Sequence, residues 1–262
     1  MKRALFIPPF DDLADARIVA GLAAEAEGAG WDGVFLWDHV LRPEPRPVAD
    51  PWITLAAIAM RTERLRLGPM VTPLARRRPQ KLAREVATLD HLSGGRVTLG
   101  LGLGVDTGRE LSAFGEPVVD AAERGDLLDE GVPLLRSMLR GERVRHDGRF
   151  FTADDVTLLP AAVQRPVPVW MAVRTLNRRP LRRAAGVDGI FPIELTPGAV
   201  AGLLAEVATL RPNGLDRFDV VALASSGAPP DEWTDAGATW WFHDFSPGAT
   251  AFDVRAAIHG SA

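Results

Sequence analysis

The feature of this sequence that most constrains its fold is a regular alternation of short apolar runs with longer amphipathic segments. The alternation runs from one end of the chain to the other, with eight apolar runs in 262 residues. Strands that alternate with helices imply a parallel sheet with right-handed crossovers. Eight such units in about 250 residues favour a closed TIM (β/α)8 barrel over an open doubly wound sheet. The expected strands are residues 4–8, 32–38, 65–71, 96–104, 166–173, 187–193, 218–224 and 238–245.

No internal repeat, low-complexity tract or linker divides the chain, so we expect one barrel domain over residues 1–262. Helix starts are marked by capping residues before prolines, at Asp50-Pro51 and at Thr196-Pro197. Residues 14–29 are expected to form the first helix, with Ile18 on its buried face. The segment 142–165 breaks the alternation, and it is expected to form a short hairpin with its turn at Asp147-Gly148, before the fifth barrel strand.

Composition excludes several classes of protein. The chain has no cysteine, which rules out disulfides and thiolate chemistry. Its formal net charge of −4 argues against nucleic-acid binding. No stretch approaches the roughly 20 apolar residues needed to span a bilayer. The first apolar run is cut by Pro8-Pro9, so it is expected to be a strand and not a signal peptide, and the expected location is cytoplasmic.

A TIM barrel carries its active site at the C-terminal ends of its strands. His39 follows the run 32–38, and imidazole titrates near neutral pH, so His39 is the leading candidate for a catalytic acid or base. Alternatively, His39 only hydrogen-bonds a loop carbonyl. Its neighbour Asp38 faces the other side of the strand, so Asp38 is not expected to be its partner. His243, at the end of the run 238–245, is a weaker candidate.

The other histidines, His91, His146 and His259, are expected to be solvated. No histidine and carboxylate cluster has the spacing of metal ligands, so no metal site is expected.

Three further segments lie at the same end of the predicted barrel. The run GLGLG at 100–104 lacks the GxGxxG spacing, and it is either an approach for a flat ring system or a tight turn. Residues 174–180 join a strand to a helix start, and they form either a phosphate site or an ordinary capped N-terminus. The arginine run 76–78 either meets an anionic cofactor tail or lies in a solvated loop.

Several of these segments together resemble the bacterial-luciferase-like superfamily of flavin-dependent monooxygenases and deazaflavin-dependent oxidoreductases. The segment from strand 65–71 through LSGGR to GLG is the most specific, and the resemblance covers most of the chain. The matching segments are GWDGVFLWDHV at 30–40, residues 50–104, residues 114–139, and DDVTLLPAAVQRPVPVWMAV followed by NRRPLRRAAGVDGIFPI.

The resemblance implies a barrel that holds FMN or coenzyme F-420, a 5-deazaflavin, by its tricyclic ring. It implies a non-proline cis peptide near Met70-Val71, on which the ring rests, and a phosphate held by the segment from Arg174 to Arg178. The cofactor-binding residues carried over in this way are Asp38, His39, Met70, Val71, Thr72, Gly102, Leu103, Gly104, Val173, Arg174, Thr175, Asn177 and Arg178.

The chain departs from the family pattern at three places. Sugar-phosphate dehydrogenases of the family carry a carboxylate proton donor just after the glycines, where this chain has Val105 followed by Asp106. The family's usual Gly-Gly or Gly-Ser before the fifth helix is replaced by residues 173–175. The chain is also shorter than typical members around the last two strands, which predicts a more open pocket or one closed by a partner subunit.

These observations predict an oxidoreductase that uses a reduced cofactor on a small organic substrate, with His39 as the acid or base. With FMN the reaction would be an oxygen-dependent monooxygenation, supplied with reduced cofactor by a flavin reductase; with the deazaflavin it would be hydride transfer. One alternative is a flavin-binding barrel without turnover. Another is a barrel enzyme that acts on a phosphorylated substrate with no redox cofactor. The family further implies a homodimer formed by the helices after the second and third strands.

Overall fold

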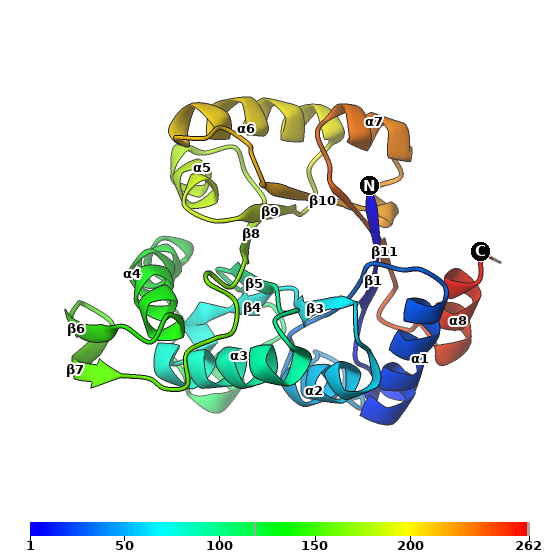
Figure 1. Cartoon of the computed structure of the whole chain (residues 1–262), viewed down its shortest axis with the longest axis horizontal. Coiled ribbons are helices and arrows are strands. Elements are labelled where there is room, and N and C mark those ends of the chain that lie inside the picture. Colours follow the sequence, from blue (N-terminus) through cyan, green and yellow to red (C-terminus); the bar gives the residue numbers. More distant parts are fainter. Residues whose placement is uncertain (118, 261–262) are drawn as a thin grey trace.

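The computed structural model of the chain describes residues 1–117 and 119–260, so one residue of the matching segment 114–139 lies outside it. It confirms the predicted TIM barrel, with a ring of parallel strands surrounded by helices (Figure 1). The strands run in the order β3-β2-β1-β11-β10-β9-β8-β5-β4. Their bounds are β1 (Lys2–Ile7), β2 (Gly33–Leu36), β3 (Arg66–Pro69), β4 (Thr72–Pro73), β5 (Leu99–Gly102), β8 (Val169–Val173), β9 (Gly189–Pro192), β10 (Asp219–Leu223) and β11 (Trp240–Asp244).

The helices follow the strands as the alternation predicts. Asp50 accepts a hydrogen bond from the Ile53 amide at 2.9 Å, and Thr196 accepts one from the Ala199 amide at 3.3 Å, so both predicted caps are confirmed. The bounds are α1 (Ala16–Gly28), α2 (Pro51–Arg61), α3 (Pro79–Ser93), α4 (Ala121–Leu139), α5 (Arg178–Ala185), α6 (Pro197–Leu210), α7 (Pro230–Asp235) and α8 (Ala251–Ile258).

The first helix differs from its prediction at its start. Asp11–Ala14 form a separate 3-10 turn, and α1 begins only at Ala16, where Asp15 caps it. Ile18 was expected to face the core but is 39% exposed, because Val19, Leu22 and Ala23 form the buried face.

The expected third strand is divided in two by a non-proline cis peptide bond between Met70 and Val71, at the position that the resemblance implies. Its first half, β3, pairs with β2, and its second half, β4, pairs with β5. One barrel strand therefore becomes two short ones with a bulge between them.

The barrel closes between β3 and the segment before β5. Leu67 bridges Val97, and its carbonyl accepts a hydrogen bond from the Thr98 amide at 2.9 Å. The backbones approach so closely that a Cβ atom on Gly68 would lie 1.8 Å from the Thr98 carbonyl oxygen. Only glycine fits at this closing seam.

A hairpin of β6 (Arg143–Asp147) and β7 (Thr152–Thr157) confirms the excursion before the fifth barrel strand, and it projects beside α4 (Figure 1). Its turn covers residues 148–151 and not only Asp147-Gly148, because the Gly148 amide donates to the Phe151 carbonyl at 3.0 Å. Glu130 of α4 attaches the hairpin to the barrel, accepting from Nε2 of His146 at 3.0 Å and from the Phe151 amide at 2.9 Å.

Alternate residues of each strand fill the barrel interior. On β8, Trp170 belongs to the interior cluster while Met171 packs outward beneath the helices. The interior is largely aromatic, and the rings of Phe35 and Phe242 stack with centroids 4.7 Å apart. Partly buried apolar side chains lie against this cluster: Trp37, Val71, Ala172, Ile193 and Leu223. These five come from the C-terminal ends of the strands, where the predicted site lies.

Candidate functional site

The fold brings the predicted residues of the second, third and fourth barrel strands to one end of the sheet. Asp38 and His39 follow β2, and Thr72 of β4 pairs with Leu101 of β5. β5 in turn pairs with β8, which ends at Val173. The expected cofactor-binding segments are therefore neighbours in space, although their roles remain predictions.

His39 has a partner that the sequence analysis missed. Its Nδ1 lies 3.2 Å from Oε1 of Glu110, a residue of the loop that follows β5. The same carboxylate oxygen accepts from the Val40 amide at 2.7 Å and from the Leu41 amide at 3.4 Å. This contact replaces the loop carbonyl considered as the alternative partner of His39.

Glu110 is a buried anion. Its side chain is 5% exposed, and Oε2 forms an ion pair with Nη1 of Arg76 at 2.5 Å. Burial disfavours the charged carboxylate, but the hydrogen bond from His39 and the positive charge of Arg76 outweigh it, so the pKa of Glu110 lies below its ordinary value. The carboxylate is therefore ionised at neutral pH and accepts a hydrogen bond from the Nδ1–H group of His39.

The position directly after the glycines, where the resemblance implies a carboxylate proton donor, has no carboxylate, and Glu110 lies further along the same loop. Val105 is 52% exposed. Asp106 accepts hydrogen bonds from the amides of Leu111 and Ser112, so it shapes the loop that carries Glu110.

Asp38 faces away from His39, as the strand alternation predicts. Its carboxylate accepts from Oγ1 of Thr72 at 2.7 Å and forms ion pairs with Arg76 at 3.0 Å and Arg77 at 3.1 Å. The solvated-loop alternative is wrong for these two arginines, because their side chains are only 8% and 16% exposed and form ion pairs with the buried Asp38 carboxylate. The Asp38 carboxylate is thus occupied by Thr72 and the two arginines, and a contact between this carboxylate and a cofactor would have to displace these partners.

The glycines of the run 100–104 serve the bulge. A Cβ on Gly100 would lie 2.5 Å from both Sδ of Met70 and the Pro69 carbonyl oxygen, and one on Gly102 would lie 2.9 Å from Cγ2 of Val71. Gly104 has φ +69°, in the left-handed region, so the run ends in a tight turn, as one of the two alternatives predicts. These contacts give the glycines a packing role that neither expectation included.

The motif LSGGR likewise has a structural role. Arg96 is partly buried, and its guanidinium donates to the carbonyl oxygens of Ala59 at 3.0 Å, Thr62 at 2.7 Å and Leu65 at 3.0 Å. These acceptors surround the end of α2, so Arg96 ties that helix end to the loop before β5.

The expected phosphate segment lies at the start of α5. Asn177 is the residue before the helix, and its side chain makes no capping hydrogen bond. Thr175 is exposed, and Arg174 forms an ion pair with Glu194 at 2.6 Å. The first-turn amides of α5 are therefore not capped by the Asn177 side chain, which suits an anion at this helix end.

His243 does not face the barrel interior. It packs against the rings of Trp31 and Phe245 on the helix side of β11. Burial holds its pKa below the ordinary value for histidine. Nor are all of the other three histidines free in solvent: Nε2 of His91 contacts the Ala161 carbonyl at 2.7 Å, and His146 is bound to Glu130.

Within residues 1–117 and 119–260, no cluster of three histidine or carboxylate side chains could hold a metal ion. In the same part of the chain, none of the helices is both long and apolar enough to cross a bilayer.

The strand ends fit a planar organic group. The partly buried apolar side chains described above lie over the aromatic interior. Among them, Trp37 contacts the ring of His39 with centroids 6.0 Å apart. Its Nε1 is buried and has no hydrogen-bond partner among the described residues. A buried, unpaired donor beside the His39–Glu110 pair favours an acceptor on a bound ligand.

Comparison with known proteins shows the family to which the chain belongs. The family model of luciferase-like monooxygenases matches residues 4–229, so the chain belongs to this family. An F-420-dependent glucose-6-phosphate dehydrogenase of Beutenbergia cavernae is 40% identical over 217 residues, which cover 79% of this chain and 62% of that protein. The chain therefore spans less than two thirds of the length of that relative.

Two solved structures show the same fold. The coenzyme F-420-dependent tetrahydromethanopterin reductase of Methanopyrus kandleri superposes with a TM-score of 0.79 at 16% identity, over 98% of this chain and 97% of that one. A monooxygenase of Streptomyces bottropensis superposes with a TM-score of 0.71 at 24% identity, over 90% of this chain and 78% of that one.

Proposed function

We propose that this chain is an oxidoreductase that uses reduced coenzyme F-420 or FMN on a small organic substrate, with His39 as the acid or base. The observation that carries the proposal is the 3.2 Å contact between Nδ1 of His39 and the buried carboxylate of Glu110, just after the end of β2, the strand that pairs with β3. The sequence match to an F-420-dependent dehydrogenase favours the deazaflavin. FMN with a flavin reductase and molecular oxygen remains the second candidate, and the monooxygenase with the same fold supports it.

The cofactor and the residues of the site have separate roles in the proposed reaction. A reduced deazaflavin bound at the strand ends would supply a hydride, and reduced FMN would supply the electrons that activate oxygen. The Glu110 carboxylate holds the proton of His39 on Nδ1, which leaves Nε2 as the nitrogen that exchanges a proton with the substrate. Glu110 is a positioning residue, because its carboxylate fixes the tautomer and the orientation of the His39 ring.

Binding and turnover test the proposal in two steps. Titration of the purified protein with coenzyme F-420 and with FMN, followed by absorbance and calorimetry, should show micromolar binding of at least one. With reduced cofactor at saturating concentration, His39→Ala should lose turnover by about 10²–10⁴-fold. His243→Ala is the matched control, because His243 also ends a strand but faces the helices.

Binding of neither cofactor at micromolar concentration would rule the proposal out. An equal loss of turnover in both histidine variants would rule out the role of His39. Cofactor binding with no turnover on any small organic substrate would instead support the non-catalytic flavin-binding barrel.

We also propose that the protein forms a homodimer through α2 and α3. Ile53 and Met60 of α2 are each 69% exposed and lie seven residues apart, on one face of the helix. Light scattering should report a dimer for the natural chain and a monomer for Ile53→Glu. A natural chain that is monomeric at micromolar concentration contradicts this proposal.

A further inference from the structure

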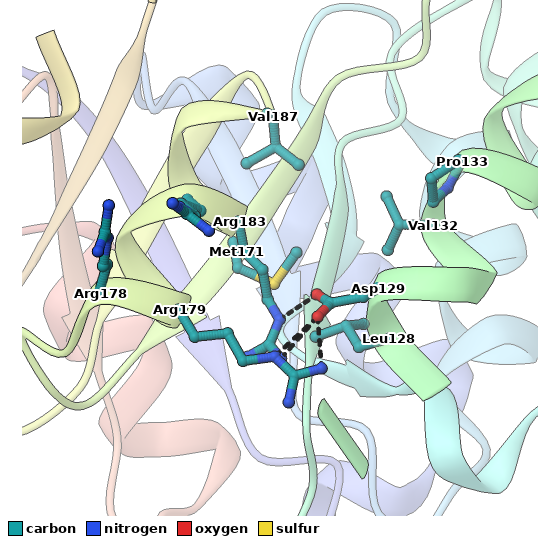
Figure 2. Close-up of a pocket in the computed structure, with 11 residues that line it drawn as sticks. Leu128, Asp129, Val132, Pro133, Met171, Arg178, Arg179, Arg183 and Val187 are labelled. Atoms are coloured by element: carbon teal, nitrogen blue, oxygen red, sulfur yellow. Dashed lines mark hydrogen bonds and ion pairs between the residues drawn. The ribbon is translucent and has the colours of Figure 1, made fainter. Parts of the chain in front are cut away.

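A cavity of about 500 Å³ lies between α4 and α5. Leu128, Val132 and Pro133 of α4 form one wall, Met171 and Val187 form the floor, and arginines of α5 form the opposite wall (Figure 2). This volume lies within the range of small-molecule pockets, about 300–1,000 Å³.

The cavity lies outside the barrel wall. Strand alternation on β8 directs Trp170 and Ala172 to the interior, while Met171 between them packs with the helix-side residues. A molecule in the cavity is therefore separated from His39 by the strand itself. None of the steps assigned to the redox site uses the cavity-lining side chains Met171, Val187 or Arg182.

The sequence of α5 explains why the cavity is open. Its apolar residues Leu181 and Ala184 belong to the cluster on the far side, shared with α6, so α5 presents arginines toward α4. Arg179 and Arg183 reach across to α4 and bind Asp129, with nitrogen–oxygen distances of 2.7 Å and 3.2 Å (Figure 2). Ion pairs therefore span a gap that apolar side chains fill between most packed helices.

The arginine wall carries more positive charge than its acidic partners neutralise. Asp129 and Asp126 pair with Arg179, and Asp129 also pairs with Arg183. Arg182 also lines the cavity, and it has no ion-pair partner among the described residues. Arg178 lines the cavity as well, but it belongs to the segment expected to hold the cofactor phosphate, so its charge is not assigned to the cavity. The cavity thus combines an apolar floor with the uncompensated guanidinium group of Arg182.

We propose that this cavity is a second ligand site, which binds an amphipathic anion with an apolar tail and a carboxylate head. The apolar floor removes the tail from water, and burial of each methylene group contributes about 0.8 kcal/mol. The guanidinium of Arg182 offers the planar pair of donors that a carboxylate accepts. The site goes beyond the proposed redox function and does not depend on it.

Decanoate serves as the probe, and methionine methyl groups report where it binds. The chain has five methionines, and protein labelled with ¹³C at the methionine methyls distinguishes them by NMR once Met171→Leu has assigned the key signal. Decanoate should shift the signal of Met171, at the cavity floor, and leave Met70, inside the barrel, unchanged. A shift of Met70 without Met171, or no shift at millimolar decanoate, overturns the proposal.

Variants test the charge and the cavity separately. Arg182→Gln should weaken decanoate binding roughly tenfold, since a hydrogen bond to a charged group is lost. The control Arg61→Gln removes an exposed arginine of α2 and should change nothing. Val187→Phe fills the cavity and should abolish the shift of Met171. Binding of neutral decanol as tightly as decanoate, or equal weakening by the two arginine variants, overturns the anionic part of the proposal.

Discussion

Replacing Glu110 by glutamine removes one buried negative charge while keeping the shape of the side chain. In the natural protein, Oε1 accepts from His39, Val40 and Leu41, and Oε2 accepts from Arg76. A glutamine amide has one oxygen and one NH2 group, so one of these two sets of donors must face another donor.

The expected loss of stability depends on which buried charged groups the substitution leaves without a partner. Breaking a buried ion pair by removing one partner costs about 3–5 kcal/mol. Arg76 keeps its contact with Asp38 at 3.0 Å, which lowers the cost. We therefore expect Glu110→Gln to reduce the free energy of unfolding by about 2–4 kcal/mol. For a chain of this size the midpoint of thermal unfolding should fall by roughly 5–10 °C.

Urea unfolding followed by tryptophan fluorescence at pH 7 measures the difference. Glu116→Gln is the matched control, because Glu116 is an exposed residue of the same loop and forms no ion pair among the described residues. If both variants unfold within about 0.5 kcal/mol of the natural protein, the range expected of unremarkable surface changes, the reasoning about Glu110 is wrong.

The same variant predicts a dependence on pH. The pKa of Glu110 in the folded protein lies below its value of about 4.3 in the unfolded chain. Its contribution to stability is therefore complete above that unfolded value and is lost as the pH falls through the folded pKa. The stability difference between natural protein and Glu110→Gln should be constant from pH 7 to about pH 5 and shrink below it. A difference that grows on acidification contradicts this.

Three other substitutions test the fold around the site. Gly100→Ala places a methyl group in the bulge and should destabilise the protein by about 1–3 kcal/mol in thermal unfolding. Its control is Gly21→Ala in α1, where a Cβ meets nothing within 4 Å, and this variant should be neutral or stabilising. Equal stability of the two variants contradicts the close packing at Gly100. Asp38→Asn leaves Arg77 with only its longer ion pair to Glu85, at 3.7 Å, and should cost about 2–4 kcal/mol in urea unfolding; a cost below about 1 kcal/mol contradicts the buried network. Glu130→Gln should lower hydrogen-exchange protection across the β6–β7 hairpin but not in β1; unchanged protection in the hairpin contradicts its attachment through Glu130.

The barrel and most of its elements could be predicted because their signals are local. The caps at Asp50 and Thr196 need only a short side chain placed before a helix start, and the alternation of apolar runs reports the strand order directly. The start of α1 was misplaced because Asp11–Ala14 form a short 3-10 turn of their own, and capping by Asp15 then sets where the helix begins.

The site could be predicted only in part, because its partners are far apart in the sequence. Strand alternation correctly separates Asp38 from His39. Glu110 lies 71 residues from His39, in a loop with no periodic pattern to predict its path. The role of the glycines was also beyond local reasoning, since it depends on how closely Met70 packs against the neighbouring strand.

The closing seam at Gly68 has a consequence for how this barrel opens. The seam and the bulge at Met70–Val71 belong to the same divided strand, only two residues apart. A fluctuation that separates β3 from the Thr98 segment therefore also loosens the bulge, which lies at the same end of the barrel as the candidate site. The Thr98 amide donates a hydrogen bond across the seam, so its hydrogen exchange should report how often the candidate site opens. A ligand that holds the bulge in place should slow this exchange.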